Sequence, residues 1–155
     1  MKPWAIVLVT VLAMSASSCT TIRDEIASCT DLKIVYAGSV LHVAGYPEGL
    51  FSVDNVGGSV AKLPMASEVG RDIHGRYADI EQLSPGRDDW HLFNPQLDEF
   101  PPPTKHLTIL PGQRDEFRYG ANGLFLSPRP SSEMKYSIVV RDARGCTYRS
   151  ATFRL

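Results

Sequence analysis

His91 and the two aspartates before it are the residues whose types and spacing are most typical of an acid–base or metal-ligating site. Asp88 and Asp89 are followed by Trp90 and His91. Imidazole and carboxylate groups transfer protons and ligate divalent metals, so this set could serve a hydrolase or a metal-dependent enzyme. A solvated surface loop is the simpler interpretation, because the adjacent carboxylates repel each other and no second cluster is visible in the sequence.

No other pattern points to catalysis. The remaining histidines form neither H-E-x-x-H nor a close metal pair; they are His42, His74 and His106. His42 alternates with Leu41 and Val43, which predicts that it faces solvent from a strand. There is no G-x-S-x-G nucleophile motif, and Gly57-Gly58 lacks the Lys-Ser/Thr of a phosphate-binding loop. We therefore predict no enzyme, and we expect no catalytic residue, metal or cofactor.

An aromatic segment is the best candidate for binding. Its members are Trp90, His91, Phe93 and Phe100, and Pro101-Pro102-Pro103 follows them. Rigid apolar side chains on a long loop are typical of recognition surfaces. Two alternatives remain open. The aromatic rings could pack beneath the loop as a satellite core, or an edge strand could offer its backbone to a partner.

The first 18 residues predict a secretory signal helix. Lys2 supplies a positive charge, and Trp4 to Met14 is an apolar run broken only by Thr10. The run is too short to span a bilayer core of about 30 Å, and small residues follow it as they do at peptidase sites.

Ala16-Ser17-Ser18-Cys19 resembles the lipobox of bacterial lipoproteins, with Ala16 where leucine is usual. This resemblance implies acylation of Cys19, and Thr20 in place of aspartate implies sorting to the periplasmic face of the outer membrane. Membrane attachment through the lipid would follow. Conventional cleavage after Ala16 or Ser18, releasing a soluble periplasmic protein, is the alternative. An uncleaved anchor is disfavoured because Ser15 to Ser18, which follow the apolar run, include no aromatic or basic residue.

Three cysteines are an odd number for an exported protein. If Cys19 carries the lipid, Cys29 and Cys146 remain to form a disulfide, as an oxidising compartment would favour. Two buried, reduced thiols are the alternative.

Size and charge limit the function classes. Removing residues 1–18 leaves 137 residues, enough for one domain with its own core. Lys2 leaves with the leader, so 15 basic residues face 17 acidic ones, a net charge of −2. A near-neutral chain with interleaved charges is not built to bind nucleic acid.

The rest of the chain must position these residues with strands. Short β-branched and aromatic runs separated by turn residues predict strands over 32–36, 40–44, 50–53, 59–63, 77–83, 90–93, 106–110, 117–119 and 124–126. Pro47-Glu48-Gly49 is predicted as a turn, and 64–76 as the one place for a short helix. Amphipathic helices of the length a parallel α/β sheet needs are missing.

The final hairpin has the clearest pattern. Tyr136, Ile138 and Val140 alternate with polar or smaller residues, and Gly145 can take the positive φ of the turn. Cys146 to Leu155 should return with Ala151, Phe153 and Leu155 on one face. This hairpin resembles the closing strands of immunoglobulin-like sandwiches, a likeness that implies architecture alone. We predict an all-β, immunoglobulin-like sandwich over residues 31–155, a lipidated tether over 19–30 and a signal peptide over 1–18.

Together these features predict an exported envelope lipoprotein that acts as a non-enzymatic binding or accessory module. The competing hypotheses are a secreted hydrolase or metal-dependent enzyme that uses His91, and a structural subunit that joins another envelope protein.

Overall fold

The chain folds into short antiparallel strands, as predicted. The computed structural model describes residues 29–66, 70–93, 100–121, 123–125 and 133–155; the predicted signal helix and the predicted lipidation site, Cys19, lie outside these ranges. The strands are β1 (Leu32–Leu41), β2 (Pro47–Asn55), β3 (Ala61–Met65), β4 (Ala78–Leu83), β5 (His91–Leu92), β6 (Lys105–Ile109), β7 (Arg114–Tyr119), β8 (Lys135–Arg141) and β9 (Thr147–Arg149). The prediction of an all-β sandwich is confirmed.

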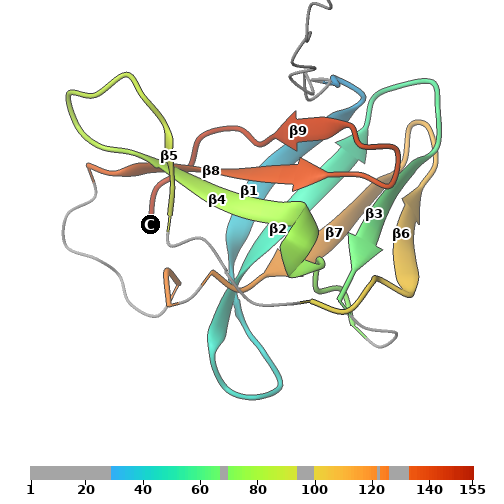
Figure 1. Cartoon of the computed structure of the whole chain (residues 1–155), viewed down its shortest axis with the longest axis horizontal. Helices are drawn as coiled ribbons and strands as arrows, with labels where there is room; N and C mark the ends of the chain where they lie inside the picture. Colours follow the sequence, from blue (N-terminus) through green and yellow to red (C-terminus); the bar gives the residue numbers. More distant parts are fainter. Residues whose placement is uncertain (1–28, 67–69, 94–99, 122, 126–132) are drawn as a thin grey trace, which may run out of the picture.

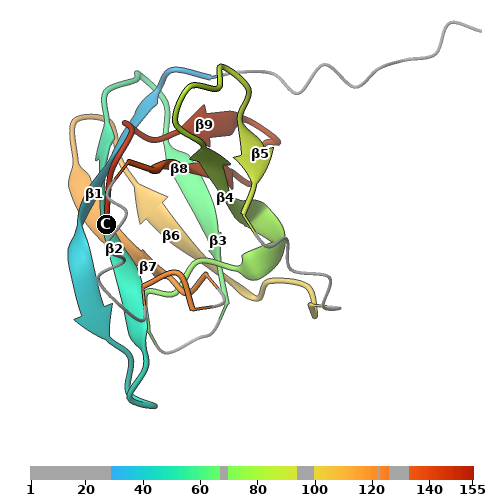
Figure 2. The same cartoon turned by 90° about the vertical axis from the view of Figure 1, so that its left-hand side faces the viewer.

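Two sheets form the layers of the sandwich. One has the order β1-β2-β7, and the other has the order β5-β4-β8-β9. The second lies over the first in Figure 1, and the turned view of Figure 2 separates them. A β3–β6 pair lies beside them. Every strand pairing within the three sheets is antiparallel.

Alternating side chains from both layers build the core. Phe51 and Val53 of β2 and Ile138 and Val140 of β8 are fully enclosed. Phe153 links the two layers: its ring lies 4.5 Å from that of Tyr36, 5.7 Å from that of Phe51 and 5.9 Å from that of Tyr136, between centroids. The predicted inward face of the last hairpin is therefore confirmed at Phe153, but Ala151 is exposed and β9 covers only three residues.

A disulfide joins the start of the described domain to its last hairpin. Cys29 and Cys146 are bonded, with their Cα atoms 5.5 Å apart. The amide of Cys29 also donates to the carbonyl of Thr147. The predicted pairing is thus present in the fold.

Several local predictions were wrong. Residues 32–44 do not form two strands: β1 runs from Leu32 to Leu41, and a bulge at Gly38 (φ 132°) takes up the extra residue. Pro47-Glu48-Gly49 is not a turn but the start of β2, because the chain already reverses over 42–46. In place of a helix over 64–76, the described part has only a 3₁₀ turn, Gly75–Tyr77. Residues 124 and 125 lie in a turn.

None of the helices found among the described residues is long and apolar enough to cross a membrane.

Candidate functional site

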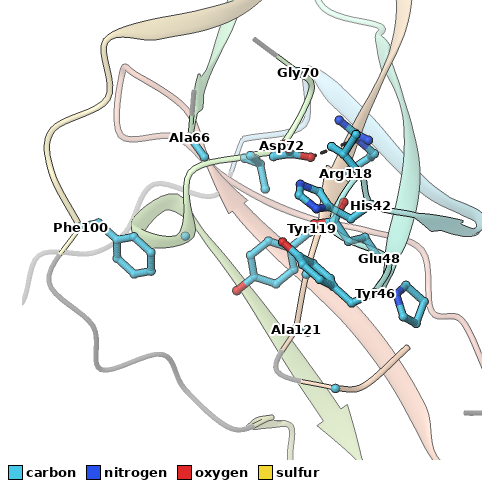
Figure 3. Close-up of a pocket in the computed structure, with 16 residues that line it drawn as sticks. His42, Tyr46, Glu48, Ala66, Gly70, Asp72, Phe100, Arg118, Tyr119 and Ala121 are labelled. Atoms are coloured by element: carbon cyan, nitrogen blue, oxygen red, sulfur yellow. Dashed lines mark ion pairs between the residues drawn. The ribbon is translucent and has the colours of Figure 1, made fainter. Parts of the chain in front are cut away.

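An open cavity of about 900 Å³ lies at one end of the β1-β2-β7 sheet, and we call it the Glu48 pocket (Figure 3). Its polar wall comes from two parts of the chain, residues 42–48 and the stretch around residue 72. His42 and Tyr46 belong to the β1–β2 connection, Glu48 to the start of β2, and Asp72 to the chain after β3. The remaining lining residues include Val43, Ile73, Phe100, Arg118, Tyr119, Gly120 and Ala121.

The tight β1–β2 connection fixes the ring of His42. The amide of His42 donates to the carbonyl of Tyr46 at 2.8 Å, and Gly45 closes the turn with a φ of 85°. The two rings stack, with centroids 4.5 Å apart and planes 16° from parallel. Nδ1 of His42 accepts from the amide of Ala44 at 3.0 Å. This assignment places the proton of a neutral ring on Nε2. His42 is half-buried in the pocket wall, so its predicted solvent-facing position was wrong.

A short parallel bridge to β7 of the β1-β2-β7 sheet positions Asp72 at the pocket. Asp72 bridges to Arg118 in a parallel arrangement, and the amide of Ile73 donates to the carbonyl of Arg118. Asp72 thereby lies beside β7, where Arg118 Nε is 3.0 Å from its Oδ1 (Figure 3). This contact is an ion pair without hydrogen-bond geometry, since Oδ1 is buried and has no hydrogen-bond partner in the part of the chain that the structure describes.

Glu48 is the least expected side chain in the pocket. It is only 4% exposed, although it alternates out of phase with the core residues Phe51 and Val53. The opposing strand end leaves room for it: a Cβ on Gly120 would lie 3.3 Å from Oε1 of Glu48. Oε2 is buried and accepts no hydrogen bond from any described residue. Because of the 3.3 Å approach to Oε1, any side chain at position 120 would crowd the carboxyl group of Glu48.

Burial raises the pKa of Glu48, and the negative charge of Asp72 raises it further. His42 and Arg118 oppose this shift. The cause is the loss of hydration around a carboxylate whose Oε2 gains no donor from the described residues. The ligand-type atoms of His42, Glu48 and Asp72 lie within 4.8 Å of one another, a grouping that the sequence analysis did not predict.

Tyr119 has a structural role in the wall. Its hydroxyl donates to the carbonyl of Ala78 at 2.8 Å, so it connects β7 to β4. Burial raises the pKa of Tyr119 far above its ordinary value, and nearby Asp79 adds to the effect. A phenol held in this way does not release its proton near neutral pH.

The predicted aromatic segment is divided among three surroundings. His91 lies on β5 with a side chain 38% exposed, and its Nδ1 is 3.7 Å from Oδ2 of Asp89. Arg149 stands over the ring of Trp90 at 5.3 Å, and Phe93 packs on the core with its ring 6.1 Å from that of Tyr136. Only Phe100 lines the Glu48 pocket. Residues 94–99, within this segment, lie outside the described ranges.

Sequence reasoning missed the pocket for two reasons. Glu48 stood between proline and glycine and was interpreted as part of a turn. Asp72 followed Arg71, which suggested an ordinary solvated surface. The only sequence signal was an acidic residue, Glu48, directly after Pro47 and just before a run in which apolar residues alternate with polar ones. This pattern is not specific for a binding site.

Comparison with known proteins gives no assignment: no protein-family model, curated protein or solved structure matches the chain.

Proposed function

We propose that the chain is an exported, lipid-anchored binding protein of the bacterial envelope, and that the Glu48 pocket is its ligand site. One observation carries the proposal. Glu48 is almost wholly buried, faces an open cavity, and has a carboxylate oxygen without a donor among the described residues. Burying an acceptor without a donor costs about 1–3 kcal/mol, so folding alone gives no reason to keep it. A ligand that brings a donor would remove this cost.

The shape of the pocket supports a binding role. A volume near 900 Å³ is within the range of small-molecule sites, which are largely apolar with a few placed polar groups. Tyr46 and Phe100 supply aromatic surface, and Val43 and Leu41 are exposed by 94% and 73% on the neighbouring hairpin. The hairpin therefore places exposed apolar side chains beside the polar wall of the pocket.

A fragment screen of the full chain by ¹⁵N–¹H NMR tests the ligand site. We expect the perturbed amides to fall in residues 42–48, 70–73 and 118–121. Glu48→Gln should remove or weaken the hits. Glu116→Gln, an exposed acid on β7 outside the pocket, is the matched control and should leave them unchanged. A set of hits that ignores the pocket, or none at all, contradicts the proposed site.

The anchor is a separate prediction. The cysteine pair at positions 29 and 146 supports an oxidising compartment and leaves Cys19 for acylation. Intact-mass measurement of the mature protein should give a chain that starts at Cys19 and carries two or three acyl groups. Cys19→Ser should leave precursor or release soluble protein. A mature chain without lipid that begins at Ser17, Cys19 or Thr20 would show conventional cleavage instead.

A further inference from the structure

The charges in the Glu48 pocket do not balance. Glu48 and Asp72 contribute two carboxylates, and Arg118 contributes one cation, paired to Asp72. These three side chains together carry one net negative charge when both carboxylates are ionised. Two carboxylate oxygens, Oε2 of Glu48 and Oδ1 of Asp72, are buried and accept no hydrogen bond from any residue described. Oε2 of Glu48 therefore has no donor among the described residues, Oδ1 of Asp72 has only the ion pair with Arg118, and one negative charge is not balanced.

We infer that the ligand of this pocket presents a primary ammonium group, which donates to Glu48 and Asp72. This inference rests on the proposed function and names the chemistry of its ligand. An ammonium nitrogen has three N–H donors and one positive charge, so it fills both acceptors and neutralises the site. Acceptors about 2.8 Å from one tetrahedral nitrogen lie about 4.6 Å apart. One ligand-type atom from each of His42, Glu48 and Asp72 lies within 4.8 Å of the other two, a spacing that accommodates such a nitrogen.

A divalent metal ion is the competing occupant, and three features disfavour it. Nδ1 of His42 already accepts from Ala44, so the other ring nitrogen carries the proton and has no lone pair for a metal. A divalent ion would bring the net charge of the site, with Arg118 included, to +1. A cavity of about 900 Å³ also far exceeds the space one ion needs.

The apolar part of the pocket indicates an organic body behind the ammonium group. Phe100 lies on the opposite side of the opening from His42 and Tyr46 (Figure 3). Ile73 and Ala121 add aliphatic surface to the lining. Aromatic rings near a cation contribute further attraction through their electron-rich faces. The ligand is therefore a primary amine with an apolar or aromatic body.

Such an ammonium group has two sources: a small free amine, or a lysine side chain on a peptide or protein. The exposed Leu41 and Val43 beside the opening would suit the second source, because they can contact the chain that carries the lysine. The experiment therefore includes one probe for each source.

The test is calorimetric and NMR titration of the full, oxidised chain at neutral pH. The probes are 2-phenylethylamine, its uncharged analogue 2-phenylethanol, Nα-acetyl-lysine amide, the same compound acetylated at Nε, and ZnCl₂. We expect each amine to bind at least about 10-fold more tightly than its uncharged counterpart and to perturb residues 42–48, 70–73 and 118–121. Glu48→Gln should weaken amine binding about 10-fold or more, and Glu116→Gln should not change it. The tighter of the two amines then identifies the source.

Three outcomes overturn the inference. If 2-phenylethanol binds in the pocket as tightly as 2-phenylethylamine, the ligand needs no ammonium group, but the proposed ligand site stands. Zinc that binds more tightly than the amines and is lost in Glu48→Gln would make the pocket a metal site. Failure of every probe, together with an empty fragment screen, would overturn both the inference and the proposed function.

Discussion

Replacing Cys29 and Cys146 together with alanine is expected to lower the free energy of unfolding by about 4–5 kcal/mol. The bond spans 117 residues of sequence, so its loss releases almost the whole domain in the unfolded state. Urea unfolding of the oxidised chain and of the variant, followed by circular dichroism, measures the difference.

Reduction of the unmodified chain is the control for this variant, since it breaks the bond without changing a side chain. Its unfolding midpoint in dithiothreitol should match that of the double variant. Two alkylatable thiols at positions 29 and 146 in protein purified without reductant, or equal midpoints with and without reductant, would contradict the role given to the bond.

Asp142→Ala is expected to cost about 2–4 kcal/mol, because it leaves several donors of the β8–β9 turn without their acceptor. Oδ1 accepts from the amides of Arg144 at 2.8 Å and Cys146 at 3.0 Å. Oδ2 accepts from Nε of Arg144 at 2.8 Å and from the hydroxyl of Tyr148 at 3.2 Å. The side chain of Asp142 is fully buried, so water cannot replace it.

Asp142→Asn is the matched control for this residue. It keeps one acceptor oxygen for the two turn amides and loses the one that serves Arg144 and Tyr148. In the same urea experiment, the free energy of unfolding of Asp142→Asn should lie between that of the original protein and that of Asp142→Ala. An alanine variant as stable as the original would mean that the turn holds its shape without the carboxylate.

Much of the framework could be predicted because it depends on local patterns. Alternation identified β4 within one residue of its start, and it identified the buried face of β8 correctly. Cysteine arithmetic gave the bond between Cys29 and Cys146. Strand limits were harder, because a bulge at Gly38 let β1 continue through residues that look like a turn.

The pocket could not be predicted, because long-range pairing creates it. Asp72 reaches Glu48 only through the short parallel bridge between residue 72 and Arg118 of β7. Glu48 also packs closely against Gly120, where a Cβ would lie 3.3 Å from its Oε1. Neither relation leaves a periodic signal in the sequence. The aromatic segment around Trp90 had such a signal, yet only Phe100 lines the cavity.

The central claim is that Glu48 serves a ligand and not the fold, and its effect on stability at two pH values tests this claim most directly. The folded state raises the pKa of Glu48, so the folded chain binds this proton more tightly than the unfolded chain does. The protonated Glu48 side chain therefore contributes most to the free energy of unfolding at pH values below the ordinary pKa of glutamate. This contribution is lost as the pH rises through the higher pKa of Glu48 in the folded state. Glutamine is uncharged at both pH values, so burying it does not require an ionised group to lose its hydration.

The measurement is the free energy of unfolding of the original chain and of Glu48→Gln, without ligand, at pH 7 and at about pH 4. We expect Glu48→Gln to be the more stable of the two at pH 7, with a difference that shrinks at the acidic pH. A Glu48→Gln variant that is less stable than the original at both pH values would contradict the account, because the carboxylate would then be holding the fold together.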